Sequence, residues 1–408
     1  MSGPSMYPAI SGQTSAGSAD ATDRALLPKK RKTGMLLTVG IVVVVVIVLL
    51  GYGASAGWFS SKGGGGANCA TDSQGLTGAG STFVYPLMNT WTTQYAQVCN
   101  VDVNYQAVGS SSGITSLEDK AVDFGASDAP LSPIQRAALP GPTLTIPETA
   151  GGVVLLYNLP GFTPILNLSG PVIAAIYLGD ITNWSAPQIV ALNPGVVMPA
   201  IPIVTVHRLD GSGTSFAFTS YLCDENTTWA NTVGRGLTTD WNNIGEGAKG
   251  SSGVAGTVAI TPGGIGYDEL AYADLNHLTF ATVENSASNF ILANQSNVQT
   301  AVAEGATGLP AGTGDWYNVT LLNEPGAQTY PIVTFSYLMV YSDLTTVYGS
   351  SMTQAEANAL GHFIYWVLTT GQSFSPGVFY IPLPSSVVQL DETTLGLVTF
   401  DGAAVSTH

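Results

Sequence analysis

The stretch from residue 201 to residue 222, IPIVTVHRLDGSGTSFAFTSYL, decides the fold class of this chain. Its first eight residues are mostly apolar and β-branched, which is typical of a buried strand. LDGSGTSF follows, with glycines and hydroxyl side chains that suit a turn, and FAFTSYL continues as a helix. A strand that runs through a glycine-rich turn into a helix is the repeating unit of parallel α/β sheets.

The same order recurs nearer the N-terminus. A short apolar stretch leads into TGAGSTF (77–83) and then into a helical pattern that begins at Tyr85, with Ser81 or Thr82 placed to cap it. The strand-like VDVNYQAV (101–108) leads into GSSSG (109–113), and VDFGASDAPLS (122–132) is expected to form a strand and a loop. These repeats predict an α/β fold with mainly parallel sheets.

Each turn ends at the N-terminus of a predicted helix. There the backbone N–H groups have no intrahelical partner and the helix dipole is positive. Glycines let the chain approach a ligand closely and hydroxyls add donors, so such a loop can hold an anion without net positive charge. One loop alone is explained equally well as an ordinary turn. Three loops of this kind, one preceded by Arg208, favour an anion site, because arginine can bind an oxyanion through two parallel hydrogen bonds.

Two aspartates accompany these donors. Asp210 lies two residues after Arg208 and is expected to hold the guanidinium in place, the alternative being an ordinary turn residue. Asp123 opens the segment DFGASD, where its charge would repel an anion that carries no proton. Phosphate at neutral pH still carries about one proton. Sulfate carries none and would leave a buried carboxylate unsatisfied, so Asp123 predicts selection of phosphate over sulfate.

The charge of the chain is unevenly distributed. The 408 residues carry a formal net charge of −16, and five of the eleven cations lie before residue 33. From residue 57 onward six cations stand against 25 acids, a net charge of −19. This balance excludes proteins that coat nucleic-acid phosphates. It also makes Arg208 informative, because only three arginines follow residue 57.

The N-terminal segment predicts a membrane anchor. Residues 1–34 have the composition of a disordered cytoplasmic tail, and the apolar run 35–56 is long enough to cross a bilayer as one helix. The cations at 29–32 place that end in the cytoplasm and the rest of the chain outside. A signal peptide cleaved at 54–56 is the alternative, although its basic region would be unusually long. A buried core helix is disfavoured because the run has no polar face. Residues 57–75 are expected to form a glycine-rich linker.

Three cysteines, Cys69, Cys99 and Cys223, allow one disulfide in an exported chain and leave one thiol over. Cys69 precedes the first predicted strand and Cys99 precedes the second. If these strands are parallel neighbours, both cysteines lie at the same end of the sheet, which favours a Cys69–Cys99 disulfide. Three reduced thiols are the alternative.

As a set, these motifs resemble the phosphate-binding protein of the high-affinity phosphate ABC transporter, the Pst-type substrate-binding protein family. The resemblance covers roughly residues 76–390 and rests on five segments in the family's usual order: TGAGSTFVYPLMNTW, VNYQAVGSSSGI, VDFGASDAPLS, HRLDGSGTSFAFTSYL and PGGIGYDELAYA. It implies a two-lobed, periplasmic-binding-protein-like type II fold with a ligand cleft between the lobes. Residues 76–148 and 332–408 would form the first lobe, and 149–331 the second.

The resemblance also implies a ligand set: Thr82, Phe83, Ser110, Asp123, Arg208, Ser212, Gly213 and Thr214. Asp123 would accept the phosphate proton, and Asp210 would orient Arg208. The family implies no cofactor, no metal and no catalysis. Its partners would be inorganic phosphate and the permease subunits, with the binding body on the extracytoplasmic side of the cell membrane.

Three other functions are weighed against this one. The chain could bind another tetrahedral oxyanion such as sulfate, molybdate or arsenate, or act as a phosphate-sensing surface protein without a transporter. A phosphoesterase using Ser212, His207 and Asp210 is disfavoured, since adjacent strand residues such as His207 and Arg208 face opposite ways. No GxSxG elbow surrounds Ser212, and no P-loop lysine follows a glycine-rich turn.

Overall fold

The computed structural model describes residues 74–242 and 244–407. The predicted tail (1–34), the predicted membrane anchor (35–56) and nearly all of the predicted linker (57–75) lie outside these residues. No helix in the described part of the chain is both long enough and apolar enough to cross a membrane. The membrane anchor therefore stays a prediction.

The predicted disulfide falls only partly within the described residues. Cys99 is disulfide-bonded, and Cys223 is free. Cys69 lies outside the described residues, so the pairing of Cys69 with Cys99 stays a prediction.

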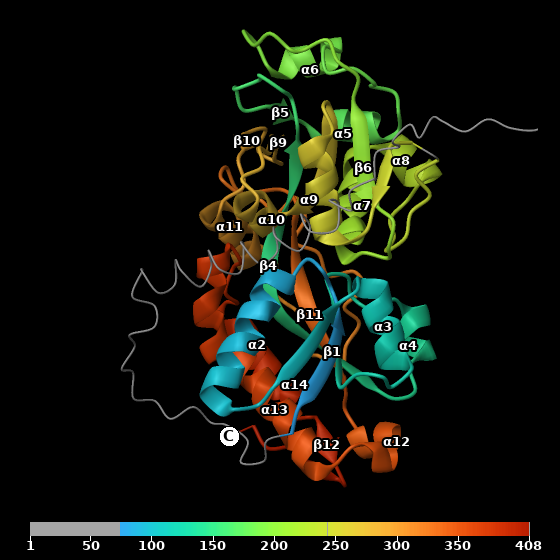
Figure 1. Ribbon diagram of the computed structural model, residues 1–408, viewed down its shortest axis with the longest axis vertical. Coiled ribbons are helices and arrows are strands. Elements are labelled where there is room, and N and C mark those ends of the chain that lie inside the picture. Colours follow the sequence, from blue (N-terminus) through green and yellow to red (C-terminus); the bar gives the residue numbers. More distant parts are fainter. Residues whose placement is uncertain (1–73, 243, 408) are drawn as a thin grey trace, which may run out of the picture. The chain divides into compact units, whose positions relative to one another are not determined.

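One eight-stranded sheet runs through the body in the order β2-β1-β3-β11-β4-β8-β6-β7 (Figure 1). Its strands are β1 (Leu76–Gly80), β2 (Val103–Ala107), β3 (Phe124–Ser127), β4 (Thr143–Tyr157), β6 (Val204–Arg208), β7 (Glu246–Ala248), β8 (Gly264–Glu269) and β11 (Val333–Tyr341). Two small sheets hold the other strands of the described residues: β5 (Asn167–Leu168), β9 (Thr282–Glu284) and β10 (Phe290–Ile291) in one, and β12 (Thr399–Phe400) and β13 (Ala403–Ala404) in the other.

Helices cover both halves of this sheet (Figure 1). The α-helices are α2 (Tyr85–Cys99), α3 (Ser110–Glu118), α4 (Pro133–Ala138), α5 (Gly170–Tyr177), α6 (Pro187–Leu192), α7 (Gly213–Glu225), α8 (Thr227–Thr232), α9 (Gly250–Ile260), α10 (Leu270–Leu275), α11 (Gln295–Gly305), α12 (Leu344–Tyr348), α13 (Gln354–Leu368) and α14 (Ser385–Leu395). Two 3₁₀ helices, η1 (Gly349–Ser351) and η2 (Thr370–Val378), flank α13.

The pairing of the strands confirms the predicted α/β architecture. β1 is parallel to both β2 and β3, and β6 is parallel to both β7 and β8. The two strands at the centre differ, because β11 is antiparallel to β3 and β4, and β4 is antiparallel to β8. The strand-turn-helix repeats therefore lie in the parallel outer thirds of the sheet, on either side of an antiparallel centre.

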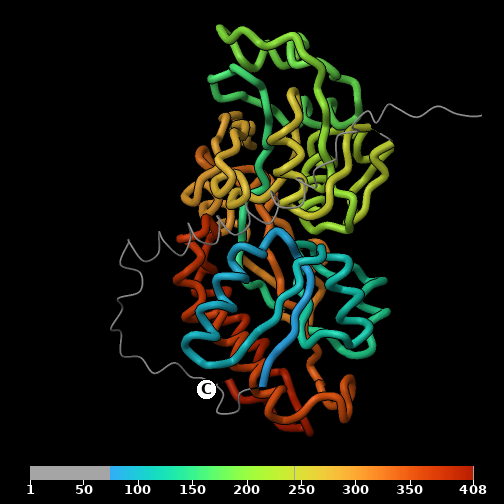
Figure 2. Tube along the Cα trace, viewed as in Figure 1, coloured from blue at the N-terminus to red at the C-terminus, as the bar shows by residue number. Residues whose placement is uncertain are grey.

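The long strand β4 joins two lobes. Its 15 residues are all buried, and residues 143–147 and 149–152 pair with β11 whereas residues 153–157 pair with β8. In Figure 2 the blue and red parts of the trace share one lobe, and the green and yellow parts form the other. The predicted boundary at residue 148 lies within β4, and the one at residue 332 lies just before β11. The two lobes are called the first and the second lobe below, in chain order.

The first lobe depends on close contact between β1 and its neighbours. Gly80 has a φ of +147°, and a Cβ built on it would lie 2.0 Å from the carbonyl oxygen of Ala126. A Cβ on Gly113 would lie 2.4 Å from the Cα of Gly80. The first turns of α3 can therefore lie directly against the end of β1, which brings two of the predicted anion-binding loops together.

Helix α13 begins with a side-chain cap. Thr353 and Glu356 form a capping box, in which each side chain bonds to the backbone N–H of the other residue. Its apolar stripe of Leu360, Phe363 and Ile364 is fully buried, so this face contributes to the core.

We expect Gly80→Ala to lower the free energy of unfolding by about 3 kcal/mol or more, because a methyl group would strain the backbone and overlap a buried carbonyl. Gly256→Ala is the matched control, since a Cβ there has no neighbour within 4 Å and the position lies in the exposed middle of α9. That substitution should raise stability by about 0.5–1 kcal/mol. Urea denaturation measures both, and equal effects would contradict this view of the core.

Candidate functional site

The predicted anion-binding loops meet between the two lobes, at the carboxyl ends of β1, β3 and β6. The backbone N–H of Gly213 donates to Ser110 Oγ at 3.0 Å, and the N–H of Ser111 donates to the carbonyl of Gly211 at 3.0 Å. The helix starts of α3 in the first lobe and α7 in the second lobe therefore face each other directly. Donors from both lobes point into one small, buried region.

The start of α7 carries three of the predicted residues. Ser212 caps the helix, since its Oγ accepts from the backbone N–H of Ser215 at 3.2 Å. A Cβ on Gly213 would lie 2.6 Å from the backbone nitrogen of Asp128, so this close approach requires glycine. Thr214 is 1% exposed, and its hydroxyl has no hydrogen-bond partner among the described residues. Leaving a buried hydroxyl unpaired costs about 1–3 kcal/mol, which a ligand oxygen would offset.

Arg208 lies at the end of β6 and is 5% exposed. Its Nε donates to Asp210 Oδ1 at 2.9 Å, and its Nη2 pairs with Asp210 Oδ2. Burial disfavours the charge of Arg208, but the hydrogen bond and charge of Asp210 outweigh it and raise the pKa of the guanidinium. Burial likewise acts against the Asp210 carboxylate, and pairing with Arg208 outweighs it and lowers the Asp210 pKa. Both groups are therefore charged at neutral pH.

The neighbouring His207 turns away from Arg208. Its ring stacks on that of Trp241, with centroids 4.8 Å apart and planes 15° from parallel. Since Asp210 is paired with Arg208 and the Ser212 hydroxyl caps α7, this geometry argues against a hydrolytic triad made of Ser212, His207 and Asp210.

A fourth helix start, which is not among the predicted loops, joins the site. The backbone N–H of Ser251 in α9 donates to Thr82 Oγ1 at 3.1 Å, and the N–H of Gly250 donates to Asp210 Oδ1 at 2.9 Å. The Thr82 carbonyl accepts from the hydroxyl of Tyr272 at 2.6 Å. The segment KGSSGVAG (249–256) has the same glycine and serine composition as the other loops, so its sequence carried the signal.

The turn before α2 positions Phe83 and Ser81, the neighbours of Thr82 in the first predicted loop. Phe83 is fully buried, and its carbonyl accepts from the hydroxyl of Tyr380. The helix begins at Tyr85 with no side-chain cap, so neither Ser81 nor Thr82 caps it as predicted. Instead Ser81 Oγ accepts from the N–H of Val84 at 3.2 Å and donates to a carboxylate.

That carboxylate belongs to Asp128 and not to Asp123, the aspartate selected from the sequence. Asp123 precedes β3 and accepts from the N–H and the hydroxyl of Thr77 at 2.7 and 3.1 Å, at the amino end of β1. Asp128 follows β3, at the carboxyl end where the helix starts converge. At about 3.3 Å per residue, the four residues of β3 separate the two aspartates by more than 10 Å. The structure therefore does not bring Asp123 to the site.

Asp128 is 1% exposed and held by two hydroxyls. Ser81 Oγ lies 2.5 Å and Ser336 Oγ 3.0 Å from Asp128 Oδ1. Burial raises the pKa of Asp128 to about 6, while these hydrogen bonds and the charge of Arg208 act in the opposite direction. The carboxylate is thus mostly ionised at neutral pH and can accept a hydrogen bond from a ligand.

The charge of Arg208 also acts on a second buried acid, Asp268, at the end of β8. Burial raises the pKa of Asp268 to about 7, and the charge of Arg208 partly counters this rise. Its Oδ2 has no hydrogen-bond partner among the described residues. The site therefore combines one buried arginine with several carboxyl groups, and its attraction for an anion depends on helix starts and hydroxyls as well as on charge.

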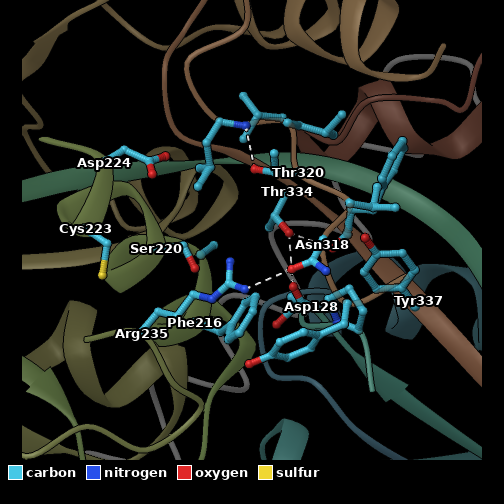
Figure 3. Close-up of a pocket in the computed structure, with 18 of the residues that line it drawn as sticks. Asp128, Phe216, Ser220, Cys223, Asp224, Arg235, Asn318, Thr320, Thr334 and Tyr337 are labelled. Carbon is cyan, nitrogen blue, oxygen red and sulfur yellow. Dashed lines mark hydrogen bonds between the residues drawn. The ribbon is translucent and has the colours of Figure 1, made fainter. Parts of the chain in front are cut away.

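A cavity of about 380 Å³ opens beside Asp128 (Figure 3). Arg235 lies there with its guanidinium over the rings of Phe216 and Tyr317, 5.6 and 5.0 Å from their centroids, and donates to Asn318 Oδ1 at 3.1 Å. These ring contacts hold the guanidinium of Arg235 beside the cavity.

Comparison with known proteins places these features in a family. A family model described as the PBP superfamily domain matches residues 65–370. The phosphate-binding protein PstS of Haemophilus influenzae is 37% identical over 318 residues, covering 77% of this chain and 90% of that protein. PstS of Methanocaldococcus jannaschii is 33% identical over 336 residues, covering 78% and 85%.

Solved structures agree in fold. A high-affinity periplasmic phosphate-binding protein (PfluDING), solved with bound phosphate, superimposes with a TM-score of 0.62 and 21% identity, covering 81% of this chain and 96% of that one. At this identity the similarity establishes the two-lobed binding-protein fold.

Because burial favours the protonated forms of Asp128 and Asp268, we expect the free energy of unfolding to fall as pH rises. Asp128 and Asp268 bind their protons more tightly in the folded state, so the free energy of unfolding decreases from the ordinary carboxyl pKa near 4 up to about 6–7. We expect a lower melting temperature at pH 8 than at pH 5, and a smaller difference in Asp268→Asn. Scanning calorimetry of both proteins measures this. An equal pH dependence in the two would contradict the assignment.

Proposed function

We propose a function from one premise: this chain belongs to the PstS family of phosphate-binding proteins. It is a receptor that captures inorganic phosphate between its two lobes and delivers it to the permease of a phosphate ABC transporter. The observation that carries this proposal is the cluster in which Arg208, the start of α7 and the carboxylate of Asp128 lie together.

The proposed ligand set keeps most of the residues selected from the sequence and replaces one. Thr82, Phe83, Ser110, Arg208, Ser212, Gly213 and Thr214 supply donors from hydroxyls, backbone N–H groups and the guanidinium, and Asp210 orients Arg208. Asp128 takes the place of Asp123 as the acceptor. Gly250 and Ser251 support this set, because their N–H groups fix Asp210 and Thr82.

Selectivity follows from the protonation of the ligand. The P–O–H group of hydrogen phosphate donates a hydrogen bond to ionised Asp128, so the carboxylate gains a partner on binding. Sulfate has no proton to donate, and it would place a second negative oxygen against a buried carboxylate. One group therefore admits phosphate and rejects sulfate.

The location of the receptor is also part of the proposal. The apolar run 35–56 anchors the chain in the cell membrane by a single pass with a cytoplasmic N-terminus, and residues 57–75 tether the binding body on the extracytoplasmic side. Support comes from the cations at 29–32, which favour this orientation.

Isothermal titration of the full chain in detergent, with phosphate and with sulfate at pH 7.5, tests the function. We expect tight phosphate binding and no measurable sulfate binding. Failure to bind phosphate, or sulfate binding of equal strength, would overturn the proposal.

A pair of substitutions tests the choice of aspartate. Asp128→Asn should weaken phosphate binding by about 10–100-fold and reduce the rejection of sulfate, because a hydrogen bond to a charged group contributes about 1.5–3 kcal/mol. Asp123→Asn is the matched control and should bind phosphate nearly as the native protein does, since within residues 74–242 and 244–407 the Asp123 side chain bonds only to Thr77, at the far end of the strand. Titration of both variants measures this, and the reverse order of effects would restore Asp123 to the site.

A further inference from the structure

A buried glutamate, Glu148, lies behind the proposed acceptor Asp128. Glu148 is in β4 and is 0% exposed. On the facing strand β11, Ser336 pairs with Thr149 and Tyr337 pairs with Pro147, so Glu148 is an extra residue in the ladder. Such a β-bulge redirects a side chain and often occurs next to binding sites. Here it accompanies a glutamate that reaches the Ser336 hydroxyl, next to the ligand cleft.

Ser336 bridges the two carboxyl groups. Its Oγ lies 2.9 Å from Glu148 Oε1 and 3.0 Å from Asp128 Oδ1. A serine hydroxyl has one hydrogen, so it can donate to only one of these oxygens. If both acids were ionised, the other contact would join two oxygens without a hydrogen between them. One of the two acids must therefore hold a proton.

The surroundings indicate which acid holds it. Asp128 accepts a second hydrogen bond from Ser81 and is stabilised by the charge of Arg208. The ionised form of Glu148 is less well stabilised, because its Oε2 lacks a hydrogen-bond partner among the described residues. A proton on Glu148 lets its carboxyl donate to Ser336 and lets Ser336 donate to Asp128.

Apart from Arg208, the groups that act on this pair are neutral near pH 7. Tyr105 interacts with both Glu148 and Asp128, and its pKa is raised well above the ordinary value by burial and by these charges. Tyr337 and Tyr380 lie near Asp128, and burial, with the charge of Asp128, raises their pKa values as well. From η2, the neutral Gln372 side chain donates to the Glu148 carbonyl at 2.9 Å. Arg208 is the cation that acts on Asp128.

We propose that Glu148 is a positioning residue that holds a proton at neutral pH and, through Ser336, fixes Asp128 as the ionised acceptor of the hydrogen bond from phosphate. This inference rests on the proposed function. Its consequence is that phosphate affinity falls on the alkaline side, when Glu148 releases its proton to solvent and Ser336 can no longer serve both carboxylates.

The position of that fall follows from burial. Burial raises the pKa of Glu148 to about 8, with the hydrogen bond from Ser336 acting downward and the charge of Asp128 acting upward. Above this pH a second buried negative charge lies behind Asp128. Phosphate loses its second proton near pH 6–7 and keeps its last one through this range, so a P–O–H group stays available to Asp128. The loss of affinity is therefore assigned to the protein.

Phosphate titration of the full chain at pH 7.0 and pH 9.5 tests this inference with the native protein, Glu148→Gln and Asp391→Asn. A glutamine cannot ionise, and its amide donates to Ser336 as the protonated acid does. We expect the native affinity to fall about tenfold more between these pH values than that of Glu148→Gln, because the added charge repels the ligand. Asp391 is the matched control: it is 0% exposed, both its carboxyl oxygens lack hydrogen-bond partners within the described residues, and burial raises its pKa well above the ordinary value. Asp391→Asn should follow the native profile.

The outcomes separate this inference from the function itself. Phosphate binding with the same pH profile in the native protein and Glu148→Gln would overturn the role of Glu148 and leave the receptor function intact. No phosphate binding at either pH would overturn the function. Glu148→Met, which also cannot ionise and suits an apolar site, gives the same test if circular dichroism shows that the glutamine variant is unfolded.

Discussion

The ion pair between Arg208 and Asp210 is the interaction on which the rest of the site depends. It lies at the end of β6, where the strand gives way to the loop before α7, and the same Asp210 carboxylate also accepts from the backbone N–H of Gly250 at the start of α9. One carboxylate thus orients the buried guanidinium and fixes a second helix start. Since breaking a buried pair leaves an unpaired charge, this arrangement resists rearrangement.

The ion pair also explains how an acidic body can hold an anion. The residues from 57 onward carry a net charge of −19, yet Arg208 is buried among helix starts whose N–H groups attract negative charge locally. Electrostatic attraction in a dry site depends on the nearest groups far more than on distant surface charges, which salt screens. Net charge therefore excludes binding of a polyanion without excluding a single phosphate ion enclosed between two lobes.

The glycine-rich loops and the pairing of Arg208 with Asp210 could be predicted from the sequence, because each involves residues close together in the chain. The strand, turn and helix around Arg208 and Ser212 follow from residue type and spacing alone. Asp123 and Asp128 lie in one short motif, and the choice between them depends on where β3 begins and ends. Ligands of parallel sheets bind outside the carboxyl ends of the strands. This rule would have favoured Asp128, which follows β3, over Asp123, which precedes it.

Glu148 could not be predicted in this way. Its position depends on a bulge between β4 and β11, and on a bridge to Ser336, which is 188 residues away in the sequence. Ser251 lies between these cases, because its loop has the right composition but its contact with Thr82 joins two lobes. Contacts of this kind follow from the register of the sheet and from the closure of the cleft.

The most direct test of this account is a crystal structure of the chain grown with phosphate. We expect one phosphate ion between the starts of α3 and α7, with one oxygen within hydrogen-bond distance of Asp128 and another within reach of the Thr214 hydroxyl. A phosphate ion bound at Asp123, or bound in the cavity beside Arg235 with these residues unoccupied, would contradict it.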